Sequence, residues 1–485
     1  MKNIFYLIIQ FLLISCSVGP NYRVPENPLP SSYSVTDKKT SFNKETREIH
    51  FWYSYINDPT LVDLIKQALS GNNLDIQKSL ANLQQSRAEL NIAKANFFPK
   101  VDATGQVSRD RLSGNSQVLS AFPTGIIPLS DTDYNVGFDA SWEIDIFGHT
   151  RRTVEASLAL FQSSLENQRN IAIAVSAEVA SVYIRYRVYQ QQMIIAQSTI
   201  DSYAETAKLV KLQMRAGSAT GVDLNRVESD LLSAKASLPP LQAEAKATLA
   251  SLAVLVGKTP ENLFKQLNHI APIPIINPKI IHVGLPSDLL RRRPDIKMAE
   301  RDLAAATATI GIAISDQFPR FQLVGDLGSD TTIPGSYFHK ASILWSVGPK
   351  ISFPIFEGGR LKNAVKAQEA IRDAALATYK HSVLQALADV ESSLIRYDRE
   401  RSKKQKLLAS YKKLDTTVRL IKLQYQTGES SLLDVLDAER QLNTLHDQYA
   451  QSEGQVLINL ISLYKALGGD WSMETTQAGS IYDVI

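Results

Sequence analysis

Hydrophobic residues in two long stretches of the chain recur at the spacing of an α-helix that packs against another helix. One series has 4-3-4-3-4 spacing: Leu407, Tyr411, Leu414, Val418, Ile421 and Tyr425. An earlier stretch has a similar series: Val179, Val182, Tyr186, Tyr189, Met193, Ile200 and Tyr203. A continuous apolar seam of this kind is typical of coiled coils and requires a partner helix. We therefore predict two long helices, each paired with a second helix.

Glycine and proline, which helices tolerate poorly, mark where these helices begin and end. Neither residue occurs in His149–Ala216 or in Arg360–Thr427, and each of these runs has 68 residues. A helix of that length extends roughly 100 Å. A turn and a further helical stretch follow each run: turns at 217–221 and 428–431, helices at 222–256 and 432–467. The sequence thus predicts two long helical hairpins.

The two halves of the chain resemble each other in sequence as well as in pattern. Phe-Pro-Lys at 98–100 corresponds to Phe-Pro-Arg at 318–320. Lys-Leu-Gln at 211–213 recurs at 422–424, an offset of 211 residues, and both copies precede the turn glycine by the same distance. This correspondence predicts an internal duplication.

Ahead of each long helix the pattern changes to strict alternation of apolar and polar residues. From Tyr134 to Ile146 the even positions are apolar, and Ile343 to Ile355 has a similar apolar face. A period of two is typical of a β-strand with one apolar face. We expect shorter, weaker partner strands to begin at Val101 and Phe321, with loops at 111–131 and 328–340. The sequence therefore predicts two β-hairpins, at about 99–147 and 319–357, and four strands.

Alternation alone favours an ordinary water-soluble sheet packed on the helices. Three features favour strands in a membrane instead. The strands have about the ten residues that a tilted membrane strand needs, their polar faces carry charges, and Tyr134, Trp142 and Trp345 could form an interfacial aromatic girdle. Four strands cannot close a barrel, and open edges are not tolerated in lipid. Membrane strands would therefore require an oligomer, and the residues alone permit a dimer or anything larger.

Composition excludes several other classes of protein. The 485 residues carry a formal net charge of only +3, which gives no electrostatic case for binding nucleic acid. No mature segment has the run of about 18 apolar residues that a membrane-spanning helix requires. The seven histidines are scattered and form no catalytic or metal-binding motif. We expect neither an enzyme nor a bound cofactor or metal.

The N-terminus has the pattern of a secretory signal at residues 1–15. Lys2 precedes a short apolar run that ends at Ser15-Cys16, and Cys16 is the chain's single cysteine. An ordinary signal peptide that happens to end near a cysteine is the alternative. The segment from Leu13 to Cys16 resembles a bacterial lipobox, which implies that Cys16 is acylated, for example with palmitate. The residue after the cysteine is Ser17 and not an aspartate. In this respect the chain resembles lipoproteins that are sorted to the outer membrane.

Asp434 and Asp437 lie just after the second hairpin turn and share one helical face. Ser431 and Asp434 have the spacing of a capping box, and acidic residues favour a helix start. From spacing alone, helix capping is the favoured role for these carboxylates.

Motifs spread over nearly the whole mature chain resemble the TolC superfamily of outer-membrane efflux proteins, in the lipoprotein branch typified by OprM and NodT. The most specific stretch is Leu-Pro-Ser-Asp-Leu-Leu-Arg-Arg-Arg-Pro-Asp at 285–295, followed by Val-Leu-Asp-Ala at 435–438. The others are the segment 16–22, Pro25, Pro28, Trp52, Asp58-Pro59, Leu61, Ala68-Leu69 and Asn73-Leu74. Beside Asp288 and Asp295, the arginines at 291–293 favour a structural ion-pair role.

The resemblance implies a mainly α fold with a membrane β-barrel: a homotrimer with one 12-stranded barrel, continued into the periplasm by a barrel of helices. It also implies a periplasmic adaptor protein and an inner-membrane pump of the resistance-nodulation-division type as partners. We divide the chain into a signal peptide (1–15), a lipid-anchored equatorial segment (16–59), a first repeat (60–257), an equatorial linker (258–286), a second repeat (287–467) and an equatorial C-terminus (468–485).

The resemblance also implies a periplasmic gate. Asp434 and Asp437 match the acidic ring that constricts the mouth of TolC, and repulsion among six such carboxylates should raise some of their pKa values. Tyr425 and Asp223 match two further positions at that mouth, although Tyr425 is equally explained as a seam residue. Ser430 stands where an arginine is expected, which puts the closing network in doubt.

Two other functions remain open. A type I secretion duct would pass proteins instead of small molecules, although the lipobox and the arginine motif favour the efflux branch. A purely structural periplasmic coiled-coil lipoprotein would have no barrel. The sequence does not identify the exported substrate or the partner pump.

Overall fold

A computed structural model of the chain describes residues 17–26, 28–33, 42–43, 57–113, 128–275, 281–282 and 286–469. It comprises two compact units. Unit 1 consists of Met1–Pro25, Gln84–Ser163 and Ala299–Thr378, and unit 2 of Glu26–Leu83, Ser164–Met298 and Tyr379–Ile485. The signal peptide and Cys16 lie outside the described residues.

Four long helices contribute most of the described chain, and all four were predicted. They are α4 (His149–Arg215), α5 (Gly221–Val256), α9 (Arg360–Thr427) and α10 (Leu432–Ala466). The α9 helix has the predicted 68 residues, whereas α4 is one residue shorter, with 67. The turns after α4 and α9 contain Gly217 and Gly428, whose φ angles are +80° and +81°. A positive φ is strained for any other residue type, so both glycines end their helices for the same physical reason.

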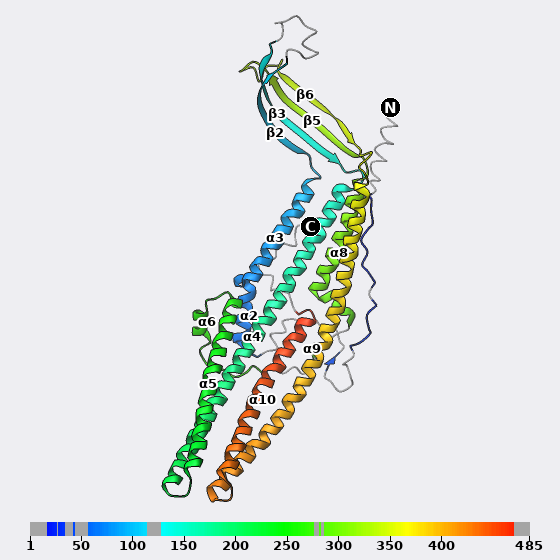
Figure 1. The fold of residues 1–485 in the computed structure, drawn as a ribbon. Coiled ribbons are helices and arrows are strands. Elements are labelled where there is room, and N and C mark those ends of the chain that lie inside the picture. The colour runs from blue at the N-terminus through cyan, green and yellow to red at the C-terminus, as the bar shows by residue number, and fades with distance from the viewer. Residues whose placement is uncertain are drawn as a thin grey trace. The chain divides into compact units, whose positions relative to one another are not determined.

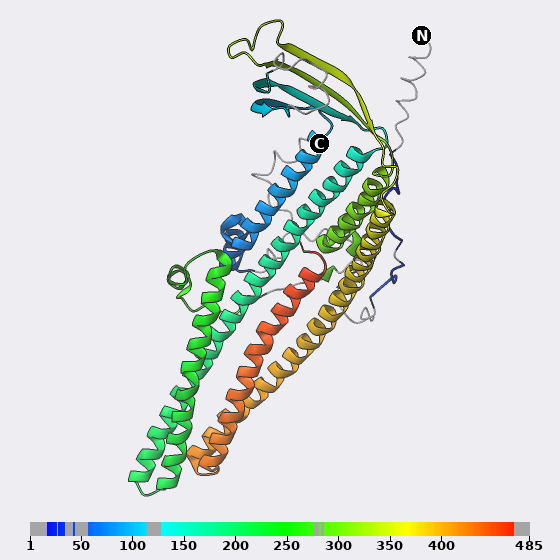
Figure 2. The ribbon, with the colours of Figure 1, turned by 45° about the horizontal axis from the view of Figure 1, so that its top comes forward.

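In unit 2 the helices form two hairpins, α4 with α5 and α9 with α10, whose turns lie at the same end (Figures 1 and 2). A buried apolar cluster joins the hairpins near these turns. Its members come from three helices: Tyr203 and Val210 on α4, Val227 on α5, and Leu432 and Leu436 on α10. Burial of apolar side chains between neighbouring hairpins removes the exposed seam that an isolated hairpin would present to water.

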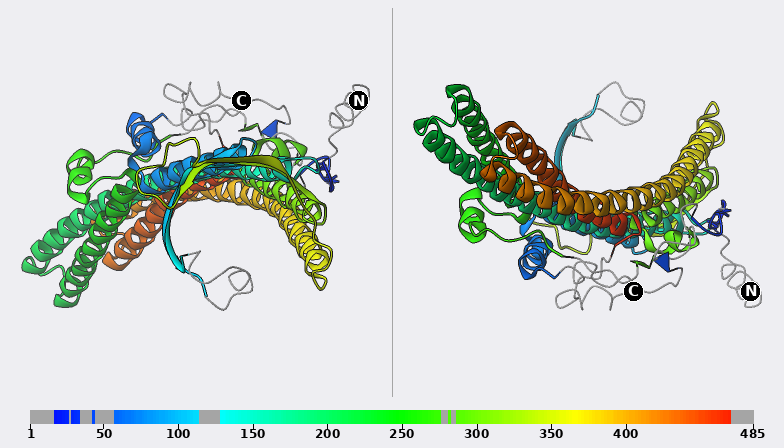
Figure 3. Two further views of the ribbon diagram at one scale, coloured as in Figure 1. Left: turned by 90° about the horizontal axis from the view of Figure 1, so that it is seen from above. Right: turned by 90° about the horizontal axis from the view of Figure 1, so that it is seen from below.

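Unit 1 contains a curved four-stranded antiparallel sheet (Figure 3). Its strands are β2 (Lys100–Arg111), β3 (Ser130–Ile144), β5 (Arg320–Thr331) and β6 (Ile343–Ser352), in the spatial order β2-β3-β5-β6. The two predicted hairpins are β2-β3 and β5-β6, and β3 pairs with β5 to join them into one sheet.

The strand predictions were wrong in some details. The β5 strand was expected to be the shorter strand of its hairpin, but it has 12 residues and β6 has 10. The β2 strand is, as expected, shorter than β3, with 12 residues against 15. The β3 strand ends at Ile144 because the Asp145 carboxylate accepts hydrogen bonds from the backbone N–H groups of Thr150 and Arg151 and thereby starts α4. The β6 strand ends at Ser352, so Phe353 and Ile355 of the predicted apolar face lie beyond it.

Shorter elements surround the long helices of unit 2. They are β1 (Phe42–Asn43), α2 (Pro59–Gln67), a π-helical turn (Ala68–Asn72), α6 (Pro260–Leu267), β4 (Ile281–His282), a 3₁₀ turn (Pro286–Asp288) and α7 (Leu289–Arg292). The β1 strand pairs in parallel with β4. Two further helices, α3 (Leu74–Ala95) and α8 (Pro294–Ser315), contribute residues to both units.

Buried side chains of α4 fix this irregular part of unit 2. Arg187 is 1% exposed and donates hydrogen bonds to the Tyr183 hydroxyl, the Gln190 side chain and the His269 carbonyl. The Tyr183 hydroxyl donates to the Asp58 carboxylate at 2.6 Å. These bonds supply the partners that a buried guanidinium requires, and they hold segments before α2 and after α6 against α4.

Candidate functional site

Asp434 caps α10, as its spacing from Ser431 predicted. The Asp434 backbone N–H donates to the Ser431 hydroxyl oxygen at 3.2 Å, and the Asp434 carboxylate accepts from the Ser431 backbone N–H at 3.0 Å. The hydroxyls of Ser431 and Ser430 donate to the same carboxylate oxygen at 2.6 and 3.2 Å. Hydrogen bonds from Ser431, and then from Ser430, lower the pKa of Asp434. Within one chain this direction is opposite to the rise expected from repulsion in an acidic ring.

Asp223 has the same position in the first hairpin. It forms a capping box with Thr220 at the start of α5, and the hydrogen bonds from Thr220 lower its pKa. Asp437 has no capping role. It accepts a hydrogen bond from Gln441 at 2.7 Å and faces Arg440 at 3.9 Å. Asp434 and Asp437 are both exposed, and the residues between them, Val435 and Leu436, are buried. The two carboxylates therefore share the outward face of α10.

Tyr425 connects the two hairpins. Its hydroxyl donates to the Gln213 side-chain oxygen at 2.6 Å, which links α9 to α4. Its ring packs against the buried cluster near the turns, and this burial raises the pKa of Tyr425. Tyr425 is thus both a seam residue and a link between hairpins. Its hydrogen-bond partner is Gln213, and the nearby charge of Asp223 also raises the pKa of Tyr425.

An ion pair with a buried carboxylate, which the sequence did not reveal, joins three helices near the same turns. Glu439 on α10 is 3% exposed, and one of its oxygens contacts Lys422 Nζ of α9 at 2.5 Å. The same oxygen accepts from the Ser202 hydroxyl of α4 at 2.6 Å. Lys422 belongs to the repeated Lys-Leu-Gln motif, which was recognised only as a marker of duplication. No local spacing identifies a contact between residues separated by 237 positions.

A second link between the hairpins is nearer the surface. Arg440 on α10 contacts the Asp230 carboxylate on α5 at 3.1 Å. The Arg440 side chain is 56% exposed and that of Asp230 is 22% exposed. Together with the contacts of Tyr425 and Glu439, this pair ties both helices of one hairpin to both helices of the other.

The register of the sheet separates an apolar face from a polar face. Ala103, Phe138, Leu327 and Trp345 lie directly opposite one another on the four strands. The last three are 59%, 56% and 71% exposed, so the described chain leaves this face uncovered. A contiguous exposed apolar face requires an apolar environment or a partner.

The adjacent row on the other face is acidic. Asp102, Asp139 and Asp326 lie opposite one another, with Ser346 at the end of the row. The Thr104 hydroxyl donates to Asp139 at 3.0 Å, and Lys100 contacts Asp102 at 2.8 Å. The polar face of the sheet therefore has a band of carboxylates across three neighbouring strands.

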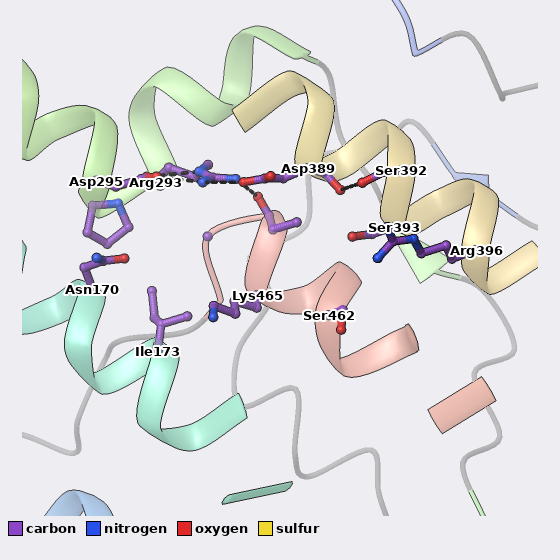
Figure 4. A pocket seen from close by; sticks show the side chains of 13 residues that line it. Asn170, Ile173, Arg293, Asp295, Asp389, Ser392, Ser393, Arg396, Ser462 and Lys465 are labelled. Carbon is purple, nitrogen blue, oxygen red and sulfur yellow. Dashed lines mark hydrogen bonds and ion pairs between the residues drawn. The ribbon is translucent and has the colours of Figure 1, made fainter. Parts of the chain in front are cut away.

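Arg293 of the arginine motif has a structural role. It pairs with Asp295 on α8 at 2.6 Å and with Asp389 on α9 at 3.0 Å, and it donates to the Ala466 carbonyl at the end of α10. Figure 4 shows these groups at one side of a polar cavity of about 300 Å³, with Lys465 and Arg396 on other walls. The ion pair with Asp295 was predicted. The pair with Asp389, 96 residues away, was not.

Among the described helices, none combines the length and the apolar character needed to cross a membrane. Nor does the described part of the chain contain a group of three or more His, Cys, Asp or Glu side chains placed to hold a metal ion.

Comparison with known proteins assigns this architecture. The family model described as outer membrane efflux protein matches residues 64–258 and 285–469. The chain belongs to the outer membrane efflux protein family. Nodulation protein T of Rhizobium leguminosarum bv. viciae is 30% identical over 467 residues, which cover 96% of this chain and 93% of the relative. The solvent efflux pump outer membrane protein SrpC of Pseudomonas putida is 31% identical over 470 residues, which cover 95% of this chain and 97% of the relative.

Solved structures agree with this assignment. The outer-membrane channel OprN has a TM-score of 0.84 at 31% identity, and the match covers 94% of this chain and all of that one. The open-state MtrE channel of Neisseria gonorrhoeae has a TM-score of 0.80 at 26% identity, with 94% and 98% covered. The resemblance to the TolC superfamily and its NodT and OprM branch is therefore confirmed.

This membership establishes what the chain does and where it acts. It is an outer-membrane channel of a tripartite efflux system. Channels of the TolC superfamily are homotrimers that work with periplasmic adaptor proteins and inner-membrane pumps of the resistance-nodulation-division type. The family is one of transport channels, not of enzymes.

Proposed function

We propose that three copies of this chain close their sheets into one 12-stranded outer-membrane barrel, through which small molecules from the pump leave the cell. The observation that carries this proposal is the direction of the strands. All neighbours in the order β2-β3-β5-β6 are antiparallel. The outer strands β2 and β6 consequently run in opposite directions. The β6 strand of one copy would meet the β2 strand of the next as an antiparallel pair, which is the pairing of closed membrane barrels.

The two faces of the sheet support the same arrangement. The exposed apolar row through Phe138, Leu327 and Trp345 would face lipid, and the carboxylate row through Asp139 would face a water-filled lumen. Closure would pair the backbone groups of both outer strands, which lipid would otherwise leave unsatisfied. Passive conduction needs no catalytic group, since the pump would supply the energy, and we propose that the channel has no enzyme activity.

The chain would also be anchored by lipid. We propose that residues 1–15 are removed as a signal peptide and that Cys16 is then acylated. An acyl anchor attaches a protein to one leaflet without spanning the bilayer. The anchor would therefore add to the attachment that the barrel provides.

We also propose an internal duplication with the domain boundaries given above. The correspondences at an offset of 211 residues, the matching turn glycines Gly217 and Gly428, and the two separate stretches matched by the family model support it.

At the periplasmic end we propose that Asp434 and Asp437 form an acidic ring in the trimer, with Tyr425 and Asp223 beside it. Their positions next to the hairpin turns and the exposed face shared by the two aspartates support this role. Tyr425 would hold neighbouring hairpins together through Gln213. Ser430, in the position where an arginine is expected, donates a hydrogen bond to Asp434 and would contact the ring in this way.

Two experiments test the proposal. Electrophoresis of the outer-membrane fraction tests whether the chain forms a trimer, and deletion of the gene tests whether the cell needs it for efflux. We expect a trimer that is stable in detergent until heated, and greater sensitivity to dyes, detergents and antibiotics on deletion. A chain that is released as a monomer after deacylation would instead be a structural lipoprotein. A stable trimer whose deletion changes sensitivity to none of the compounds would favour a type I protein secretion duct.

A further inference from the structure

A buried arginine in unit 1 holds the first described residues of the chain. Arg152 on α4 is 2% exposed. Its Nε donates to the Val18 carbonyl at 3.0 Å, and its Nη2 donates to the Gly19 carbonyl at 3.2 Å and to the Asn21 side chain at 2.9 Å. Its Nη1 contacts Glu155 at 2.7 Å. Three of these four hydrogen bonds therefore go to the N-terminal segment.

The backbone of this segment is fixed at the junction between β3 and α4. The Val18 N–H donates to the Phe147 carbonyl at 3.1 Å. Ser17 fills the space beside Gly148, where an added Cβ would lie 2.9 Å from the Ser17 Cα atom. The chain thus reaches this junction one residue after Cys16.

Contacts with α8 fix the other end of the segment. Gly19 has a φ of +92°, and a Cβ added there would lie 2.5 Å from the Gly311 Cα atom, so the two backbones touch. The Tyr22 hydroxyl donates to Glu300 at 3.2 Å, and the Arg301 guanidinium lies 5.5 Å from the centre of the Tyr22 ring. Residues 17–22 therefore contact two helices at defined positions, although they form no helix or strand.

Docking of this kind strongly limits where the N-terminus can be. A buried guanidinium is costly unless its N–H groups are paired, so Arg152 favours the docked segment over a released one. If residues 16–25 were released, ten residues could reach about 35 Å. That distance is comparable with the hydrocarbon core of a bilayer, which is about 30 Å thick. When residues 17–22 are docked, Cys16 is limited to the distance that one residue can span from Ser17.

We propose that residues 17–22 form a docked connector that seats the acylated N-terminus at the junction between β3 and α4, with Arg152 as its positioning residue. The inference rests on the acylation of Cys16 proposed above. Because β3 is a membrane strand in the proposed barrel, the connector places the acyl chains at the end of the strands, in the leaflet that faces the periplasm. The anchor then holds each chain at the depth that strand pairing between copies requires.

Arg152→Gln tests the positioning role, because glutamine is too short to bond three groups of the connector. Gly19→Ala is an independent variant that keeps Arg152 and places a methyl group against Gly311. Gly71→Ala is its matched control: Gly71 has a nearly identical φ of +96°, but no atom lies within 4 Å of the added Cβ. All four full-length chains are purified from membranes in detergent, and the mass of the N-terminal lipopeptide is measured for each.

In Arg152→Gln and in Gly19→Ala we expect the Val18 amide to exchange hydrogen at least about tenfold faster than in the wild type, because its hydrogen bond to Phe147 opens. We expect acylation to persist and the yield of heat-sensitive trimer to fall about fivefold, whereas Gly71→Ala should match the wild type in all three measurements. Unchanged exchange in both variants overturns the docking. Faster exchange with a normal trimer yield overturns the seating role.

The same data separate this proposal from the channel function on which it rests. An unmodified Cys16 in a wild-type chain that still forms a trimer overturns the connector's role in seating an anchor, but not the barrel. A wild-type chain that is acylated and protected at Val18 but never forms a trimer contradicts the proposed barrel, and with it the role of the connector in assembly.

Discussion

The aspartates near the hairpin turns have separable local roles. Asp434 and Asp223 cap helices, and the hydrogen bonds of their caps lower the pKa of each carboxyl. Asp437 contacts its own helix, through Gln441 and Arg440. Because Asp437 has no capping role, its charge can be removed without loss of a helix cap, and Asp437 and Asp434 can be tested against each other.

Replacement of both Asp434 and Asp437 by alanine should weaken the block of the channel by multivalent cations. Rings of carboxylates attract cations, and a cation with several charges binds most strongly. We expect the concentration for half-block to rise by about tenfold or more in single-channel recordings on planar bilayers, which corresponds to about 1.4 kcal/mol of binding free energy. Unchanged block by the double variant would refute the acidic ring.

Single substitutions separate the ring from the cap. Asp437→Asn should reduce the block without changing the stability of α10, since it removes no capping bond. Ser431→Ala serves as the control, because it removes the cap of α10 and keeps both carboxylates. If Ser431→Ala weakens the block as strongly as Asp437→Asn, loss of a cap and not loss of ring charge explains the effect.

Elements whose boundaries depend on local chemistry were predicted well. The length of α9 follows from the absence of glycine and proline, and the turn after it follows from Gly428. The length of β5 was underestimated because the glycines and aspartates that it contains are unusual in strands. Pairing with a neighbouring strand keeps those residues in the sheet. The pattern of residues along one strand gives no information about such pairing.

Contacts between distant elements were not predictable from the sequence. Arg152 holds the N-terminal segment through two backbone carbonyls, which any residue type provides. Glu439 meets Ser202 only because α10 packs beside α4. The capping box of Asp434, in contrast, lies within a single turn of the chain and was visible in the sequence.

The Arg440–Asp230 pair should help to keep the two hairpins of one chain together. Arg440→Asp and Asp230→Arg should each place like charges at this contact, whereas the double variant restores an opposite pair. An exposed pair contributes little free energy, about 1 kcal/mol or less, but like charges in contact are repulsive. We expect each single variant to increase single-channel conductance or entry of large antibiotics, and the double variant to reverse most of the increase.

The control for this charge exchange is Arg419 on α9. It pairs with Asp415, which lies one turn earlier on α9 itself. Arg419→Asp changes the charge by the same amount but breaks no link between hairpins, so it should leave conductance unchanged. If the effects of Arg440→Asp and Asp230→Arg on conductance simply add in the double variant, the Arg440–Asp230 contact does not restrain the hairpins.

Closure of three sheets into one barrel would turn the acidic row of each sheet into a band around the lumen. Asp102, Asp139 and Asp326 are paired across three neighbouring strands, so in a symmetric trimer each of them would recur three times around the lumen. Such a band favours cations, and Asn at all three positions should shift the reversal potential in a salt gradient towards zero selectivity. Asp63→Asn on α2 is the control, since it removes an exposed carboxylate outside the sheet. Equal reversal potentials in the triple variant and the wild type would place this row outside the conducting path and contradict the proposed orientation of the strands.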